Sequence, residues 1–328
     1  MSTDESQNSV DPSSDIEEDI EEGRGAYQVG GFHPVYVGDL YHRRYEVLTD
    51  EKKFRALKVL SAECYDQGTD TYEREILRHL RNGSQDEAGY PYVCHLIDDF
   101  EHKGPNGTHV CLVFELMGET LASFGVWLEN QRIPYILLRK FTLQLICALD
   151  FAHGCNVIHT DLKPDNIFVK FRDFSLIEED YLSKDFYGFD VVLGDWGVSS
   201  WADRHLTEWI QPVKLRAPEV LIQAPWDAKA DVWNLGAIIL ELYRNVRMFS
   251  GRVAPDGRYD VRQHLAEIVD FFGPFPQELL QRGSQRLVKE FFDDEGRVKG
   301  AQPVKRPGLS SEYFTPGSNQ LPDTILTL

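Results

Sequence analysis

Long apolar runs are missing from this sequence of 328 residues. Its wholly apolar stretches are as short as 110–114 and 145–149, whereas a membrane-spanning helix needs about 20 apolar residues in a row. The N-terminus is acidic and has neither the basic nor the apolar region of a signal peptide. We therefore expect no membrane span and place the protein inside the cell, in the cytoplasm, the nucleus or both.

Paired cysteines are also missing. The five cysteines include no CxxC pair and are odd in number, a pattern that indicates reduced thiols. His153, Cys155 and His159 lie close together in the sequence, but no second pair of ligands accompanies them. Because structural zinc sites use four protein ligands, we interpret these residues as parts of a helix end and a loop.

Positive charge is scarce. The formal net charge is −19, and the first 23 residues contain nine acidic side chains and no Lys or Arg. This balance repels nucleic acid and attracts arginine-rich peptides, although acidity can also serve solubility alone. Residues 1–25 have almost no large apolar groups, so we expect them to be disordered. The hydrophobic content of 42% suffices for a large core in the rest of the chain.

The most informative motif is His-Thr-Asp-Leu-Lys-Pro-Asp-Asn over residues 159–166, followed by Asp-Trp-Gly at 195–197. Asp161 can accept the proton of a substrate hydroxyl, and Lys163 can stabilise charge on a phosphoryl group during transfer. Asn166 and Asp195 offer the oxygen ligands that Mg²⁺ prefers. A lone His-x-Asp usually satisfies loop hydrogen bonds, but the full string predicts phosphoryl transfer.

Two upstream segments complete this pattern. Residues 54–60 have the apolar content and length of a buried strand, and Lys58 on it is placed to bind nucleotide phosphates. Residues 70–80 predict an amphipathic helix, in which we prefer Glu75 to Glu73 as the partner of Lys58. Taken alone, Lys58 would more often be a solvated strand lysine.

Downstream, Ala217-Pro218-Glu219 precedes a largely apolar run from Asp231 to residue 242. The first matches the Ala-Pro-Glu motif of the protein-kinase pattern. The second predicts a buried helix.

On these motifs the sequence resembles eukaryotic protein kinases and, among them, the SR-protein kinases, which phosphorylate serines in Arg-Ser repeats. The narrower resemblance rests on the leader at 30–40, on Thr160 between the catalytic-loop His and Asp, and on an insert over 249–274. It spans about residues 29–316. It implies an α+β, two-lobe kinase fold that transfers the γ-phosphoryl group of ATP, with Mg²⁺, to serine hydroxyls. Asp231 is then expected to brace the catalytic loop.

The resemblance also implies a division of the chain. We expect an N-lobe at 26–117, a C-lobe at 118–316 with its insert at about 246–300, and an irregular tail at 317–328. Phe114 would close the back of the adenine pocket, although core packing explains it equally well. Asp161, Lys163 and Asn166 would be catalytic, and Asn166 and Asp195 would hold the metal. The nucleotide site would comprise Ala56, Lys58, Glu75, Phe114, Glu115, Met117, Phe168 and Asp195.

Thr160 has a further consequence. An Arg at this position can pair with a phosphate on the activation segment, and threonine cannot. We therefore predict that activity needs no phosphorylation between Gly197 and Ala217, although the segment contains Ser199, Ser200 and Thr207.

Two departures from the kinase pattern stand out. The glycine-rich loop that covers the phosphates is missing, since no glycine lies between Gly38 and Gly68, and the chain stops at Leu328 without further C-lobe helices. Glu219 would then lack the Arg that pairs with it in the family. An imperfect gene model or splice form of an active kinase would explain both gaps, as would a variant that has lost turnover. We favour the first, because every charged catalytic position is retained.

We expect arginine- and serine-rich basic proteins as substrates, a monomeric kinase, and no direct binding to nucleic acid. The alternative is a catalytically impaired scaffold that binds basic partners. The acidic stretch 174–190 predicts a surface loop. Candidate docking acids are Asp260, Glu267 and Asp270.

Overall fold

In the computed structural model the described residues are 24–47, 54–66, 72–127, 132–171, 188–245, 247–255 and 257–304. The chain divides into two compact units. The first comprises residues 1–70 and 98–113, and the second comprises 71–97 and 114–328. The second unit thus includes residues 71–97 of the predicted N-lobe. Residues 1–23 of the predicted disordered tail, residues 174–187 of the predicted surface loop and the C-terminal tail lie outside the described residues.

The first unit is built on a three-stranded sheet in the order β3-β5-β4. Its apolar side is a cluster of Tyr41, Phe100, Cys111 and Val113. Tyr41 comes from the short β1–β2 hairpin, in which it pairs with Tyr45. The predicted strand at 54–60 is present as Arg55–Val59, but it is half-buried rather than buried, because Arg55 is exposed and the four residues after it are only partly covered. The elements are η1 (Arg24–Ala26), β1 (Leu40–Tyr41), β2 (Tyr45–Glu46), β3 (Arg55–Val59), α1 (Glu63–Asp66), β4 (Leu96–Gly104) and β5 (Gly107–Glu115).

The leader segment is attached to this sheet by its backbone. Gly30 N–H donates to the Asn106 carbonyl at 2.7 Å, and the Gly30 carbonyl accepts from Glu63 N–H at 2.8 Å. A side chain at Gly31 could not fit, since a Cβ there would lie 2.1 Å from the Ala26 carbonyl oxygen. The leader is therefore an ordered part of the first unit.

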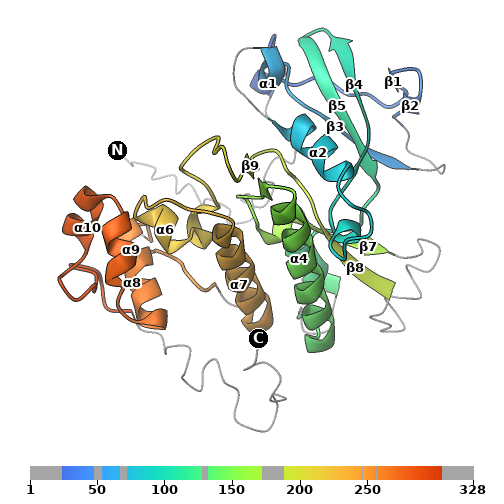
Figure 1. Ribbon diagram of the computed structural model, residues 1–328. Coiled ribbons are helices and arrows are strands. Elements are labelled where there is room, and N and C mark those ends of the chain that lie inside the picture. Colours follow the sequence, from blue (N-terminus) through green and yellow to red (C-terminus); the bar gives the residue numbers. More distant parts are fainter. Residues whose placement is uncertain are drawn as a thin grey trace, which may run out of the picture. The chain divides into compact units, whose positions relative to one another are not determined.

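The second unit is mainly helical and contains the hairpin β7–β8. Helix α4 packs against β8 and α7, and Figure 1 shows α4 and α7 side by side. No helix in the described ranges has both the length and the apolar character needed to cross a membrane. The elements are α2 (Glu73–Arg81), η2 (Tyr90–Tyr92), α3 (Leu121–Phe124), η3 (Gly125–Trp127), α4 (Tyr135–Gly154), β6 (Val157–Ile158), η5 (Pro164–Asn166), β7 (Ile167–Phe171), β8 (Phe189–Leu193), β9 (Ser200–Trp201), η8 (Val213–Leu215), α6 (Pro218–Leu221), α7 (Lys229–Arg244), α8 (Val261–Phe272), α9 (Gln277–Arg282) and α10 (Gln285–Phe291).

The sequence predicted the main helices of this unit. The amphipathic helix expected at 70–80 is α2, and the buried helix expected from Asp231 is α7. Asp260 is the N-cap of α8, and its carboxylate accepts a hydrogen bond from Arg262 N–H at 2.7 Å. Backbone N–H groups in the first turn of a helix have no partner within the helix, and this bond satisfies one of them. The molecule is α+β, as predicted.

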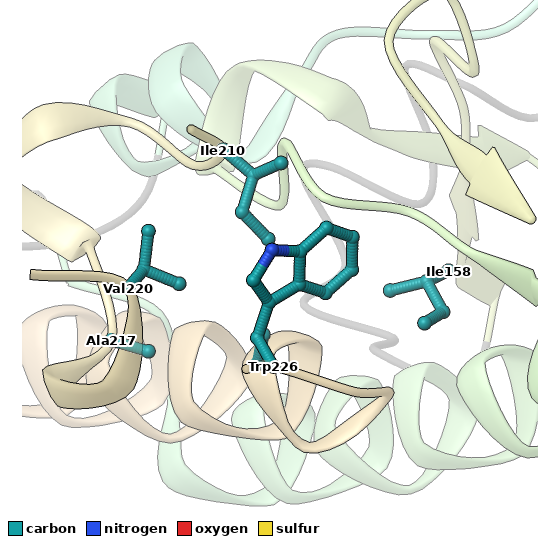
Figure 2. Packing of buried hydrophobic residues seen from close by; sticks show 6 residues of the cluster. Ile158, Ile210, Ala217, Val220 and Trp226 are labelled. Atoms are coloured by element: carbon teal, nitrogen blue, oxygen red, sulfur yellow. The ribbon is translucent and has the colours of Figure 1, made fainter. Parts of the chain in front are cut away.

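One buried cluster fixes the segment that follows the catalytic residues. Trp226 is 4% exposed and packs among Ile158, Ile210, Ala217 and Val220 (Figure 2). A buried indole of this size contributes several kcal/mol of apolar burial. The strand before the catalytic loop, the Ala217 segment and the start of α7 are thereby held in one core.

Candidate active site

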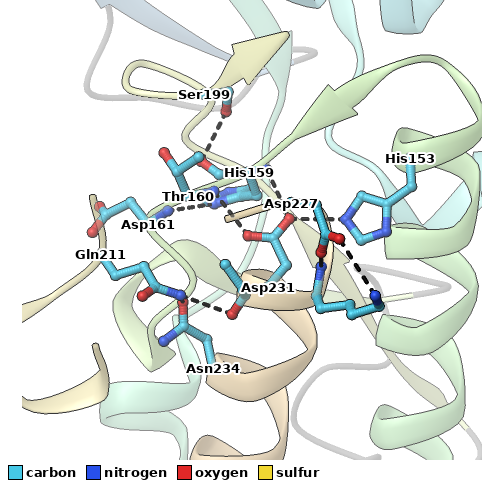
Figure 3. Close-up of polar contacts among 11 residues, drawn as sticks. His153, His159, Thr160, Asp161, Ser199, Gln211, Asp227, Asp231 and Asn234 are labelled. Atoms are coloured by element: carbon cyan, nitrogen blue, oxygen red, sulfur yellow. Dashed lines mark hydrogen bonds and ion pairs between the residues drawn. The ribbon is translucent and has the colours of Figure 1, made fainter. Parts of the chain in front are cut away.

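The catalytic loop follows β6 and is held by a buried carboxylate. Asp231 is fully buried at the start of α7, and its two oxygens accept from the backbone N–H groups of His159 (2.8 Å) and Thr160 (2.9 Å). His153 Nε2 donates to the same carboxylate at 2.9 Å (Figure 3). Asp231 thus braces the loop, as the resemblance implied.

His159 supports the loop from its other side. Its Nδ1 accepts from Asp161 N–H at 3.3 Å, so Nε2 carries the proton and donates to the Gly194 carbonyl at 2.9 Å. The ring also packs edge-on against Trp196, with centroids 4.7 Å apart. His159 therefore ties the catalytic loop to the segment that carries Asp195.

Asp161, Lys163 and Asn166 form one cluster. Lys163 Nζ and Asn166 Nδ2 both donate to Asp161 Oδ2, each at 2.9 Å. Among the described residues no donor contacts Asp161 Oδ1. The carboxylate is thus oriented through one oxygen, and the other is available to accept the proton of a hydroxyl.

Lys163 remains a cation in this cluster. Partial burial disfavours its charge, but the hydrogen bond that it donates to Asp161 and the negative charges of Asp161, Asp165 and Asp195 outweigh burial and raise its pKa. A fixed ammonium beside the proton acceptor can stabilise a phosphoryl group in transit.

The hairpin β7–β8 brings the two predicted metal ligands together. Its register pairs Ile167 with Leu193, and Gly194 N–H donates to the Asn166 carbonyl at 2.9 Å. The amide nitrogen of Asn166 donates to Asp161, which leaves the amide oxygen as an acceptor. With the Asp195 carboxylate, this oxygen gives a donor set that fits Mg²⁺. When bound, the metal would neutralise phosphate charge.

Glu73 points into the site and Glu75 does not. Glu73 is 2% exposed and Glu75 is exposed. A Cβ added at Gly197 would lie 3.3 Å from both Glu73 Oε2 and Asp195 Oδ1, so the Glu73 carboxylate faces this glycine. These positions favour Glu73 over Glu75 as the candidate partner of Lys58. The helical spacing already pointed this way, since Glu73 shares the buried face of α2 with Ile76, Leu77 and Leu80.

The comparisons with known proteins agree with this geometry. The model of the protein kinase domain matches residues 43–295. The chain belongs to the protein kinase family. It is 32% identical to a serine/threonine protein kinase of Aspergillus fumigatus over 92% of this chain and 82% of the relative. It is 27% identical to the serine/threonine-protein kinase SRPK of Physarum polycephalum (88% and 80%) and 25% identical to the protein kinase dsk1 of Schizosaccharomyces pombe (87% and 76%).

The resemblance to SR-protein kinases is thereby confirmed. The protein is an ATP-dependent protein serine/threonine kinase, of a family that generally uses ATP and Mg²⁺.

The remaining residues of the predicted nucleotide site lie on three strands and in the segment that follows β5. Ala56 and Lys58 are half-buried on β3 of the first unit. In the second unit, Phe114 and Glu115 end β5 and Met117 follows them, all half-buried. The Glu115 carboxylate pairs with Lys170 at 2.5 Å, so its side chain is engaged within the fold. Phe168 packs on Gly194, where an added Cβ would lie 2.8 Å from its ring.

The activation segment of the kinase is held by hydroxyl groups. Thr160 Oγ1 donates to the Val198 carbonyl at 2.7 Å, and Ser199 Oγ donates to the His159 carbonyl at 3.1 Å. Ser200 Oγ accepts from Leu206 N–H at 3.1 Å. Ser199 and Ser200 are each 1% exposed. Thr160 therefore anchors this segment by a direct hydrogen bond in place of the Arg–phosphate pair of other kinases.

Two polar residues that the sequence did not single out lock the end of the segment. Gln211 is 8% exposed, donates to Asn234 Oδ1 at 2.9 Å and accepts from Ala217 N–H at 2.8 Å. Asn234, fully buried on α7, donates in turn to the Leu215 carbonyl. A Gln in a loop and an Asn in an apolar helix carry no motif. The one available signal for Asn234 was that it is a polar residue within a helix predicted to be buried, where a polar side chain needs a hydrogen-bond partner.

The structure shows what surrounds the carboxylates of Glu219 and of two candidate docking acids, Glu267 and Asp260. Burial raises the pKa of Glu219, against the nearby charges of Arg282 and Lys229, and within the described part of the chain it forms no ion pair. Glu267 is 3% exposed and accepts hydrogen bonds from Ser250 and Gly251, so it is not available for docking. Asp260 caps α8. The docking role suggested for Glu267 is wrong, because a buried carboxylate fully used inside the fold cannot meet a substrate.

Proposed function

We propose that this kinase transfers the γ-phosphoryl group of ATP to serine hydroxyls in arginine- and serine-rich proteins. The observation that carries the reaction is the fixation of Asp161 through Oδ2 by Lys163 and Asn166, with Oδ1 left open as the proton acceptor. The hydroxyl proton passes to Asp161 as its oxygen attacks the γ-phosphorus, and ADP leaves.

Charge supports the choice of substrate. The net charge of −19 attracts cationic peptides and raises their rate of encounter at low ionic strength. The name of the relative in Physarum polycephalum, SRPK, supports the same substrate class. Phosphorylation by this kinase should therefore slow as salt is added.

The nucleotide is assigned to the predicted residues with one replacement. Lys58 would bind the phosphates, and Glu73 instead of Glu75 would orient Lys58. Ala56 and Phe168 would line the adenine pocket, Phe114 would close its back, and the backbone at Glu115 and Met117 would hydrogen-bond the base. Asn166 and Asp195 would hold Mg²⁺.

Phosphate transfer from ATP·Mg²⁺ to an Arg-Ser repeat peptide tests the proposal. The comparison peptides have Gln or Glu in place of every Arg, and Asp161→Ala is the control variant. We expect transfer that prefers the Arg peptide, declines with salt and disappears in the control. Transfer without preference among peptides would overturn the substrate class. Absence of transfer to any peptide, with binding of the Arg peptide retained, would favour the scaffold.

A further inference from the structure

A groove of about 700 Å³ opens beside the catalytic loop, within the second unit. One wall is Lys163, Pro164 and Asp165 of the loop itself. The facing wall is the segment 212–215 and the end of α7. Lys163 belongs both to this wall and to the Asp161 cluster. Consecutive Cα atoms are about 3.8 Å apart, so a serine that reaches Asp161 places a flanking residue in the groove.

The one buried carboxylate among the described residues of this groove is already neutralised. Glu241 has a side chain only 8% exposed, and its Oε2 accepts from Arg247 Nη1 at 2.9 Å. Its Oε1 accepts from Met248 N–H at 2.9 Å. A guanidinium is therefore already seated on the acid that a substrate arginine would seek, and a second one would have to displace it.

Lys214 adds a cation to the same wall. Its charge acts on Glu241, but with the described residues its ammonium forms neither a hydrogen bond nor an ion pair. The exposed head of Arg247, whose side chain is 62% exposed, lies on the same side of the groove. Glu241 balances only one of these two cations, so this wall carries a net positive charge.

We propose that the groove binds a residue flanking the phosphoacceptor serine, and that Arg247 and Lys214 make it select an anionic side chain over arginine. This inference rests on the proposed kinase function and names a local preference within its substrates. It is compatible with attraction of arginine-rich chains, because the overall field acts at a distance, over a Debye length of about 8 Å at physiological salt and a longer one at low salt, whereas this selection acts at contact.

A peptide series measures the preference. Each peptide has one serine in an Arg-containing frame, and one flanking position at a time carries Arg, Gln, Glu or phosphoserine. We expect one position at which Glu lowers KM about fivefold relative to Arg, the effect of one ion pair of moderate strength, with kcat unchanged. The phosphoserine peptide distinguishes selection of phosphate from selection of any anion.

Two charge removals identify the residues responsible. Arg247→Gln releases Glu241, so the preference at that position should reverse toward Arg. Lys214→Gln should abolish the preference for Glu without creating one for Arg. Arg286→Gln and Lys289→Gln are the matched controls, since both residues are exposed on α10, and they should leave the preference unchanged. Thermal unfolding checks that each variant is folded. If Arg247→Gln does not fold, the result with Lys214→Gln decides.

Three results would overturn the inference. These are equal KM values for Glu and Arg at every flanking position, a wild-type preference for Arg there, and control variants that change the preference as much as the groove variants. A failure of the kinase function is distinguishable, because then no peptide is phosphorylated. In that case fluorescence anisotropy measures the binding of the same labelled peptides. The inference still requires that the Glu peptide binds more tightly than the Arg peptide and that Lys214→Gln removes this difference.

Discussion

At the residue scale, single buried carboxylates decide how the active site is built. Asp231 accepts two backbone N–H groups and the imidazole of His153. Backbone N–H groups in a buried loop need acceptors, because each unsatisfied group lowers the free energy of unfolding by about 1–3 kcal/mol. The catalytic loop depends on Asp231 for its conformation, including the left-handed φ of 65° at Thr160.

Replacing Asp231 tests this dependence. Asp231→Ala removes the acceptors of two N–H groups, and we expect the free energy of unfolding to fall by about 3 kcal/mol, with a large loss of kcat. Urea unfolding and steady-state kinetics measure both. Asp150→Ala on the exposed side of α4 is the control. Equal effects of the two substitutions would contradict the bracing role.

Glu73 and Glu75 form a natural pair for a second prediction. Glu73 faces Gly197 beside Asp195, whereas Glu75 faces solvent. We expect Glu73→Gln to lower kcat/KM about a hundredfold, because misplacing a reacting group by about 1 Å has an effect of that size. Glu75→Gln should change kcat/KM little. Activity that depends on Glu75 instead would restore the choice made from the sequence.

At the scale of elements, the activation segment is pinned between the catalytic loop and α7. Thr160 and Ser199 hold its beginning, and Gln211 with Asn234 holds its end. Hydroxyl and amide groups in the core make these contacts, so the ordered state does not require a phosphate. The segment is thereby built into the fold of the second unit.

Dephosphorylation should accordingly leave activity unchanged. We would treat the kinase with phosphatase, verify by mass spectrometry that no phosphate remains on 197–217, and measure kcat. Thr160→Val, which removes the donor to Val198, should destabilise the segment by about 1 kcal/mol and lower kcat. Thr207→Ala should not. A strict loss of activity after phosphatase treatment would refute this account.

At the scale of the whole molecule, both units contain histidines whose pKa is lowered by burial. Burial lowers the pKa of His264 to about 3, with the charge of Arg216 as a second cause. Its Nδ1 shares a hydrogen bond with Tyr259. In the first unit, burial lowers the pKa values of His33 and His102, whose rings lie 4.7 Å apart, and the charge of His109 lowers both further.

Stability should therefore decline in acid. The unfolded chain binds protons near pH 6.5 and the folded one does not, so the stabilisation is present above about pH 6.5. For His264 it is lost as the pH falls toward about 3, by about 1.4 kcal/mol per pH unit. Urea midpoints across this range measure the slope. His264→Gln should flatten it, whereas His42→Gln, at an exposed site, should not.

Much of the site could be predicted because its residues lie in one short string. Asp161, Lys163 and Asn166 are so close in sequence that the loop between β6 and β7 forces them into contact. Long apolar helices such as α4 were predictable for a similar reason. The role of Glu267 could not be predicted, since its partners at Ser250 and Gly251 come from a different segment.

The sequence by itself determined the chemistry that we propose for this kinase: the carboxylate to accept a proton, the lysine to stabilise charge, and the oxygens that suit the metal. These are properties of side-chain type at short spacing. Tertiary structure alone decided the rest. The register of β7 on β8 brings Asn166 to Gly194, and the buried face of α2 selects Glu73. The fold of 212–215 beside α7 creates the charged groove. Contacts between distant segments depend on packing and burial, which local sequence does not encode.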